Sequence, residues 1–172
     1  MPSEGRQRLF FALWPDTAVR ARLARLARGS CERPVPACNL HLTLVFLGSQ
    51  DAGRRRCLER MAAGLAGTGP MVLELDRLGC FARARVLWLG PSHPPPALGA
   101  LAGRLASGAA ACGIETEKRP FVPHVTLSRK EKNPRQGAVS EVIRWRVGSF
   151  VLAESLSARG GVRYEVRARW PL

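Results

Sequence analysis

Two short segments of the sequence alternate apolar and polar residues, and each places a histidine and a threonine on the polar positions. One segment, 40–47, contains His-Leu-Thr-Leu at 41–44, and the other, 121–127, contains His-Val-Thr-Leu at 124–127. Residues two apart on a β-strand share a face. Each segment therefore predicts a strand with histidine and threonine on one face and branched apolar residues packed into a core on the other.

Chance is a poor explanation for this repetition. The chain has three histidines, and two of them are followed two positions later by one of its few threonines. The third, His93, lies among prolines in a predicted surface loop, so we expect it to have no part in the chemistry.

Length and charge narrow the possible classes of protein. A chain of 172 residues is typical of one compact domain with a substantial core, so we predict a single domain over 1–172 and, by default, a monomer. The net charge of +14 favours a polyanionic partner such as RNA. Apolar runs are too short for a membrane span or a signal sequence, which predicts a cytoplasmic protein without membrane contact. Five cysteines without a Cys-x-x-Cys pair predict buried thiols, not a disulfide framework or a zinc ribbon.

The predicted elements follow one order twice: a strand, a helix, a strand with the His-x-Thr motif, then further strands. Asp16 or Thr17 can cap the first helix and Asp51 the second, while leucines at 98, 101 and 105 define the third. This order predicts an α+β domain of two similar lobes whose sheets meet at a cleft, with the two His-Thr faces brought together there. The remaining predicted strands are 9–14, 71–75, 86–89, 142–147, 149–152 and 164–170, and 130–137 is a predicted loop.

Two imidazoles facing one phosphate can divide the work of phosphodiester cleavage. A neutral histidine takes a proton from the attacking water, and a charged one gives a proton to the leaving oxygen. The hydroxyls of Thr43 and Thr126 can donate to the phosphate oxygens, and Arg129, or alternatively Lys130, can add positive charge. Two histidines without neighbouring Asp, Glu or Cys leave a zinc site short of ligands, so we expect neither metal nor cofactor.

These motifs and the strings around them resemble the bacterial and archaeal RNA 2′,3′-cyclic phosphodiesterases, also called the 2′-5′ RNA ligase family, within the 2H phosphoesterase superfamily. The resemblance extends over nearly the whole chain. The matching segments are 8–13, 39–48, 86–90, 119–127 and 164–166.

The resemblance implies a two-lobed, duplicated fold in which antiparallel sheets line a basic central cleft and helices lie outside. It also implies metal-independent hydrolysis of a terminal RNA 2′,3′-cyclic phosphate to a 2′-phosphate. The residues that match the family's functional positions are His41 as proton donor, His124 as proton acceptor, Thr43, Thr126 and Arg129 as phosphate-binding residues, and Phe11 and Phe121 as residues that could stack on a base.

Two other functions remain open from the sequence. A 2′-5′ phosphodiesterase or ligase acting on oligonucleotides could use the same two histidines and two threonines. An RNA-binding protein without turnover would instead use the arginine-rich surface alone, and its binding would survive loss of both histidines.

Overall fold

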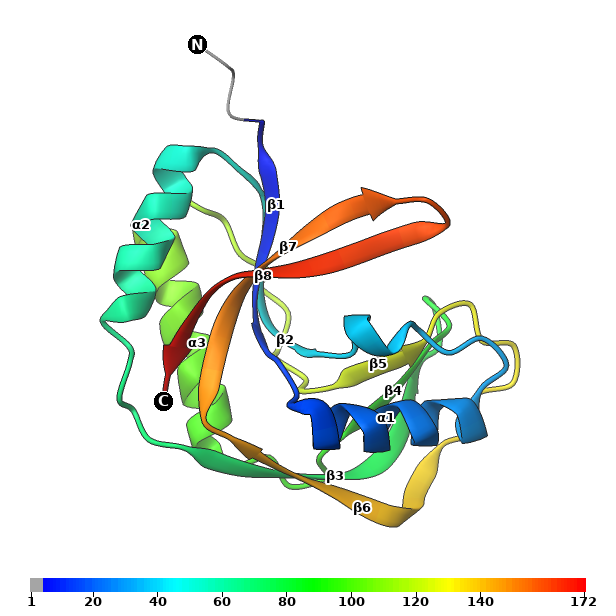
Figure 1. The fold of residues 1–172 in the computed structure, drawn as a ribbon. Helices are drawn as coiled ribbons and strands as arrows, with labels where there is room; N and C mark the ends of the chain where they lie inside the picture. Colours follow the sequence, from blue (N-terminus) through cyan, green and yellow to red (C-terminus); the bar gives the residue numbers. More distant parts are fainter. Residues whose placement is uncertain (1–4) are drawn as a thin grey trace.

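A computed structural model describes residues 5–172 as one eight-stranded antiparallel sheet with three α-helices (Figure 1). The strand order is β6-β3-β4-β5-β2-β1-β7-β8. The predicted α+β fold with antiparallel strands is confirmed. The strands are β1 (Gln7–Leu13), β2 (Leu42–Gln50), β3 (Met71–Phe81), β4 (Val86–Gly90), β5 (Val125–Ser128), β6 (Gly137–Val147), β7 (Ser149–Ala158) and β8 (Gly161–Pro171).

The sheet divides into two halves of four strands with matching connections. In one half, β1 leads through α1 (Thr17–Ser30) to its neighbour β2; in the other, β4 leads through α3 (Pro96–Ala111) to its neighbour β5. Strands β2 and β5 then meet at the centre of the sheet. Helices α1 and α3 both pack across this boundary, because α1 contacts β5 and β6 while α3 contacts β2. The repeated element order seen in the sequence thus corresponds to a repeated structural unit.

Local capping explains where the first two helices begin. The carboxylate of Asp16 accepts a hydrogen bond from the backbone N–H of Val19 at 2.8 Å, and the carboxylate of Asp51 accepts one from Arg54 at 2.8 Å, at the start of α2 (Ala52–Ala63). Such caps satisfy N–H groups that have no partner inside the helix. Both aspartates were predicted as helix caps, and α3 begins instead with Pro96 at its first turn.

Alternation along the strands separates two apolar surfaces. On β1, Leu9, Phe11 and Leu13 point into the main core between the sheet and the helices, whereas Phe10 and Ala12 point to the opposite face. There they pack in a smaller cluster with Val151 and Ala153, edged by Trp14 and Tyr164. This second face is the one on which the histidines lie.

Cys57 on α2 and Cys112, the residue that caps the end of α3, form a disulfide across 55 positions of sequence. The expectation of thiols throughout is therefore wrong for this pair. It failed because the two helices pack side by side (Figure 1), a tertiary contact that cysteine spacing does not reveal. The other three cysteines, Cys31, Cys38 and Cys80, are free.

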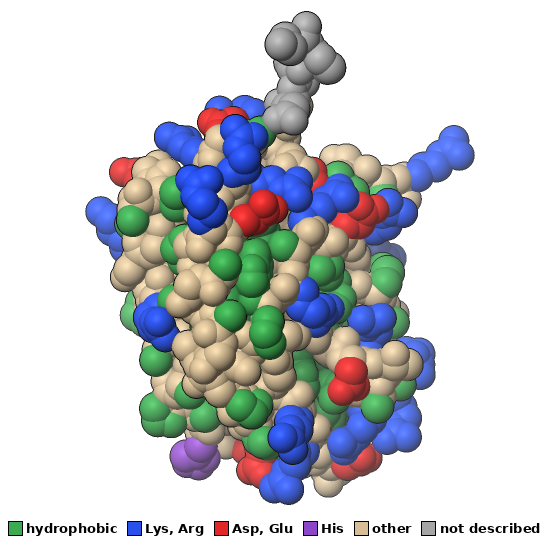
Figure 2. All heavy atoms as spheres, turned by 60° about the vertical axis from the view of Figure 1, so that its left-hand side comes forward, with side chains coloured by type: hydrophobic (Ala, Val, Ile, Leu, Met, Phe, Trp, Pro, Cys, Tyr) green, Lys and Arg blue, Asp and Glu red, His purple; other side chains and the backbone are tan. Residues whose placement is uncertain are grey.

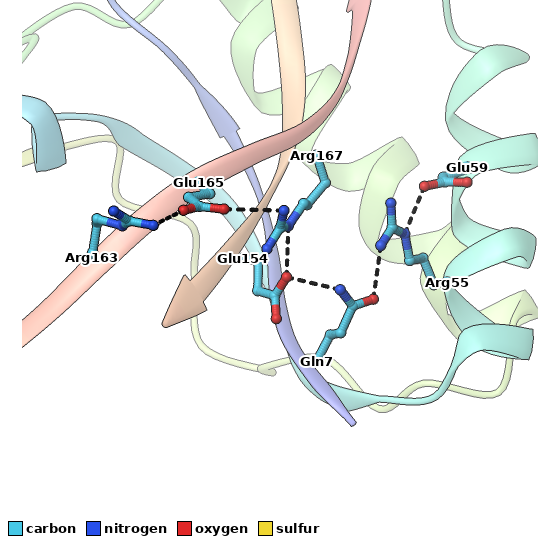
Figure 3. Close-up of polar contacts among 7 residues, drawn as sticks. All are labelled: Gln7, Arg55, Glu59, Glu154, Arg163, Glu165 and Arg167. Carbon is cyan, nitrogen blue, oxygen red and sulfur yellow. Dashed lines mark hydrogen bonds and ion pairs between the residues drawn. The ribbon is translucent and has the colours of Figure 1, made fainter. Parts of the chain in front are cut away.

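A chain of polar contacts ties the β7–β8 hairpin to β1 and α2 (Figure 3). The buried carboxylate of Glu154 accepts hydrogen bonds from Arg167 at 2.7 Å and from the Gln7 amide at 2.8 Å. The oxygen of that amide accepts a hydrogen bond from Arg55 at 2.9 Å. Glu154 is thus a buried charge with its partners in place, which is what a buried carboxylate requires. Arg163, Glu165 and Glu59 extend the network at its two ends.

The outer face of α2 and α3 has a mixed surface. Figure 2 shows this face, with Lys and Arg side chains spread among acidic and hydrophobic ones. Within residues 5–172, no helix combines the length and apolar character needed to cross a membrane.

Candidate active site

One backbone pairing brings the two His-x-Thr motifs together. Leu42 of β2 pairs with Val125 of β5 where the two halves of the sheet meet, and both side chains are fully buried. Antiparallel register continued by one residue places His41 opposite Thr126 and Thr43 opposite His124. Alternation then gives all four side chains the face away from Leu42 and Val125.

His41 is held by two hydrogen bonds. Its Nδ1 lies 2.7 Å from the backbone oxygen of Asn39, and its Nε2 lies 3.0 Å from Oγ1 of Thr43. A carbonyl oxygen only accepts, so Nδ1 carries the proton and Nε2 of the neutral ring accepts from the Thr43 hydroxyl. Nε2 is therefore the nitrogen that can exchange a proton with a substrate.

Three aromatic rings surround the imidazole of His41. Trp14 stacks on it with ring centroids 5.3 Å apart, Tyr164 meets it edge-on at 4.9 Å, and Phe10 lies 5.0 Å away. These rings fix the orientation of the imidazole and keep water from one side of it. The prediction from sequence missed all three as site residues.

Asn39 connects the His41 segment to the last hairpin. Its side-chain amide donates to the backbone oxygen of Val162 at 2.7 Å, and its side-chain oxygen accepts from the backbone N–H of Tyr164 at 3.2 Å. The same residue supplies the carbonyl that holds His41. Asn39 therefore positions both the catalytic candidate and one ring packed against it, although it does not itself carry chemistry. An asparagine two residues before the histidine was the only available sequence signal.

His124 repeats the arrangement in the other half. Its Nδ1 lies 2.7 Å from the backbone oxygen of Val122, again two residues earlier, so Nδ1 carries the proton and Nε2 is the nitrogen that can accept one. Phe81 meets the ring edge-on at 4.9 Å, and Trp88 lies 6.1 Å away. The Trp88 ring lies directly over Gly79 of β3, where a Cβ would clash with it, so glycine is required at that position.

Burial is the main influence on both imidazoles. Burial, against the opposing effect of the hydrogen bond to Asn39 and together with electrostatic effects of Arg129 and His124, lowers the pKa of His41 to about 4. Burial also lowers the pKa of His124, with a further lowering by Arg129 and an opposing effect of Val122. Both rings are consequently neutral near pH 7 in the free protein.

The structure brings Arg129 into this group, because its charge acts on both histidines. Arg129 follows β5 directly and its side chain is exposed. Thr43 and Thr126 are half-buried beside the two rings. His93 is exposed in the loop before α3, away from these residues in the sequence and without an aromatic contact of the kind seen at the other two histidines.

The two predicted stacking residues have different positions. Phe11 is fully buried and packs against Phe150 and Trp170, so the expectation that its ring stacks on a base is wrong. Bulges in the β1–β2 pairing on both sides of the Phe10–Phe11 pair obscure which phenylalanine faces the site, and it is Phe10. Phe121 is half-buried against the main core, and its stacking role stays a prediction.

Two neutral imidazoles whose Nε2 atoms carry no proton, two hydroxyls and one arginine can bind a phosphate and move protons on both sides of it. Across residues 5–172 no group of three or more His, Cys, Asp or Glu side chains is placed to hold a metal ion.

Comparison with known proteins covers nearly the whole chain. The 2'-5' RNA ligase superfamily model matches residues 15–159. The RNA 2',3'-cyclic phosphodiesterase of Escherichia coli is 39% identical, with 96% of this chain and 97% of that protein covered. The protein of the same name from Thermus thermophilus is 31% identical over 96% of this chain and 90% of its own length.

Solved structures agree with these matches. The crystal structure of E. coli LigT in apo form has a TM-score of 0.90 at 36% identity, covering 98% of both chains. LigT complexed with 3'-AMP gives 0.90 at 37% identity, covering 97% of this chain and 98% of LigT. By sequence and by fold, the chain belongs to the 2'-5' RNA ligase superfamily.

Proposed function

We propose that this protein hydrolyses the terminal 2′,3′-cyclic phosphate of RNA to a 2′-phosphate. The observation that carries the proposal is the Leu42–Val125 pairing, which sets two His-x-Thr motifs against one another. Relatives that match the chain over nearly its whole length are named RNA 2',3'-cyclic phosphodiesterases.

Each proton in the reaction has a place. Water attacks the phosphorus and gives its proton to Nε2 of His124, while the bond from phosphorus to the 3′ oxygen breaks and that oxygen takes a proton from Nε2 of His41. The products are a 2′-phosphate and a 3′-hydroxyl. Nδ1 of each ring stays bonded to a carbonyl, so both reacting nitrogens keep their orientation throughout.

The lowered pKa of His41 gives substrate binding a second role. An acid must carry a proton, and burial together with Arg129 removes it in the free protein. A bound phosphodiester anion beside the ring opposes both effects and raises the pKa of the imidazole. Binding of the substrate anion therefore recruits the proton that the leaving oxygen later receives.

The phosphate is held by groups that need no proton transfer. Thr43 and Thr126 donate hydroxyl hydrogens to the non-bridging oxygens, and Arg129 balances the charge that accumulates on them during attack. Preorganised donors of this kind are each worth roughly a hundredfold to a thousandfold in rate.

Replacement of either histidine tests the proposal. His41→Ala and His124→Ala should each reduce hydrolysis of an RNA with a 2′,3′-cyclic end by about 10²–10⁴-fold, measured as release of a 2′-phosphate product. His93→Ala is the matched control and should keep full activity. Turnover unchanged in the first two variants, or a 3′-phosphate product, would contradict the assignment.

Membership of the 2'-5' RNA ligase superfamily favours a second activity. The same residues could cleave or form a 2′-5′ linkage between oligonucleotides. Incubation with a linear 2′-5′ dinucleotide, and with paired cyclic-phosphate and 5′-hydroxyl ends, distinguishes these reactions by the length of the product.

The proposed partner is the end of an RNA. The proposed state of the protein is a monomer in the cytoplasm. Disulfides are rare in reducing cytosol, so the state of Cys57 and Cys112 in cells tests the location. Rapid thiol trapping in intact cells followed by mass spectrometry should find this pair reduced if the protein is cytoplasmic. Full oxidation of the pair in cells would place the protein in an oxidising compartment.

A further inference from the structure

Three connecting segments beside the candidate active site carry a concentration of unpaired positive charge. They are the turn between β3 and β4, the stretch after β5, and the segment after α1. Figure 1 shows them at the right-hand side of the molecule, opposite α2 and α3. We call six of their basic side chains the basic rim: Arg33, Arg83, Arg85, Arg129, Lys130 and Lys132.

Hydrogen bonds join these segments to one another. The hydroxyl of Ser128 donates to the backbone oxygen of Arg33 at 3.0 Å, and the backbone N–H of Glu131 donates to the backbone oxygen of Arg85 at 3.0 Å. The Ser128 hydroxyl also lies 3.0 Å from the carboxylate of Glu131, so its one hydrogen is shared between the two acceptors, and this contact folds the chain back around Arg129 and Lys130. The rim is therefore one connected structure, and the residue that acts on both histidines is part of it.

The charges of the rim are available to a ligand. All six side chains are exposed, and in the part of the chain that the structure describes none of them forms an ion pair. Two acidic residues lie in these segments. Glu131 is buried and bonded to Ser128, and Glu32 is exposed beside Arg33.

Backbone conformation singles out two of these positions. Arg85 and Lys130 have φ values of 52° and 59°, and every other residue with positive φ between residues 5 and 172 is a glycine. A side chain in the left-handed region costs free energy that glycine avoids. Local turn geometry thus favours glycine at both positions, yet the chain has a cation at each. Such a departure indicates a function for the side chain.

We propose that the basic rim binds the backbone phosphates of the RNA on the 5′ side of its cyclic end. The inference rests on the proposed function. A cyclic phosphate lies at the 3′ end, so all other phosphates lie on its 5′ side, one negative charge for each nucleotide. Once the end is bound near Arg129, the neighbouring phosphates meet the cations that the rim holds beside it. Binding of this kind is electrostatic and independent of sequence.

Two charge-matched triple variants test the proposal. The rim variant carries Arg83→Gln, Arg85→Asn and Lys132→Gln, and leaves Arg129 and Lys130 in place; asparagine tolerates the backbone at position 85. The control variant carries Arg56→Gln, Arg60→Gln and Arg104→Gln, which remove three exposed cations from α2 and α3. A double variant, Arg83→Gln with Lys132→Gln, avoids the left-handed position if the triple variant folds poorly.

Each protein is assayed on a 2′,3′-cyclic mononucleotide and on a ten-nucleotide RNA with the same cyclic end, between 50 and 200 mM KCl. For the rim variant we expect kcat/KM on the RNA to fall about tenfold while the mononucleotide stays within twofold of the wild type. The slope of log kcat/KM against log salt should become less steep by roughly two, since each lost contact contributes about 0.7 for single strands. The control variant should resemble the wild type on both substrates.

Equal losses in rim and control variants, or equal losses on both substrates, would overturn the proposal. Binding of the same RNA, 5′-labelled and followed by fluorescence anisotropy, separates it from the proposed function. If the wild type binds RNA through the basic rim but does not hydrolyse it, the proposed hydrolase function is refuted and RNA binding by the rim is supported. A wild type that turns over both substrates with no effect of the rim variant on either measurement refutes the rim alone.

Discussion

Leu42 and Val125 are paired across the centre of the sheet, and the residue immediately before each of them is a histidine of the candidate active site. The register of this one pairing therefore sets how the two imidazoles face each other. Since both side chains are fully buried, packing beneath the site is directly coupled to its geometry.

Shortening one of these core residues should affect catalysis as well as stability. Leu42→Ala is expected to lower the free energy of unfolding by about 2–5 kcal/mol and to reduce kcat at temperatures where the protein stays folded. Leu73→Ala, at a fully buried position on β3, is the control and should lose similar stability while keeping kcat. Denaturant melts and steady-state kinetics at 25 °C measure both quantities; equal effects of the two variants on kcat would argue against the coupling.

Arg129 should set the pH range of the reaction. Its charge lowers the pKa of both histidines, so Arg129→Gln raises both and should move the pH profile of kcat/KM to higher pH. The same change removes a phosphate contact and should cost about 10²–10³-fold in rate. A profile measured from pH 4 to 9 separates the shift from the loss. Arg56→Gln on α2 should leave the profile in place.

Stability should depend on pH through His41. Its pKa is about 4 in the folded protein, below the ordinary value of 6.5. Between these values the unfolded chain binds a proton that the folded one does not, so stability is complete above pH 6.5 and is lost as the pH falls towards 4. The loss is on the order of 3 kcal/mol.

His41→Gln should remove much of this dependence, leaving the smaller slope due to His124, whose pKa is also lowered. Unfolding midpoints in urea at half-unit pH intervals provide the measurement. His93→Gln, in an exposed loop, should retain the slope of the wild type. A wild-type midpoint that is constant between pH 4 and 6.5 would contradict the lowered pKa of His41.

Removing the disulfide should destabilise the packing of α2 on α3. Cys57→Ser or Cys112→Ser is expected to lower the free energy of unfolding by about 2–4 kcal/mol, chiefly because the unfolded chain gains freedom. A reducing agent should do the same to the wild type and nothing further to the variants. Cys38→Ser, at an exposed free thiol, should be neutral.

The sequence allowed prediction of the features that depend on local chemistry. Aspartate caps located the starts of α1 and α2, and alternation located β2, β5 and their chemical face. The edge strand β6 was predicted only from residue 142, because its first residues are mostly exposed and carry no alternating pattern, although it begins at Gly137. β3 likewise continues to Phe81, past a bulge that interrupts its pairing after Leu75.

The features that escaped prediction depend on contacts between distant segments. Tyr164 reaches His41 from the last strand, held there by Asn39, and neither spacing nor composition indicates such a contact. The Cys57–Cys112 bond is of the same kind. Phe10 and Phe11 differ by one position, and the bulges beside them decide which faces the substrate.

The order of the strands has a consequence for how the reaction depends on the whole chain. Strands β3 to β6 form one uninterrupted stretch inserted between β2 and β7 of the other half, and each half contributes one of the two histidines. Neither half alone holds both an acid and a base. Separation of β2 from β5 would therefore part the acid from the base, so activity reports directly on the contact between the two halves.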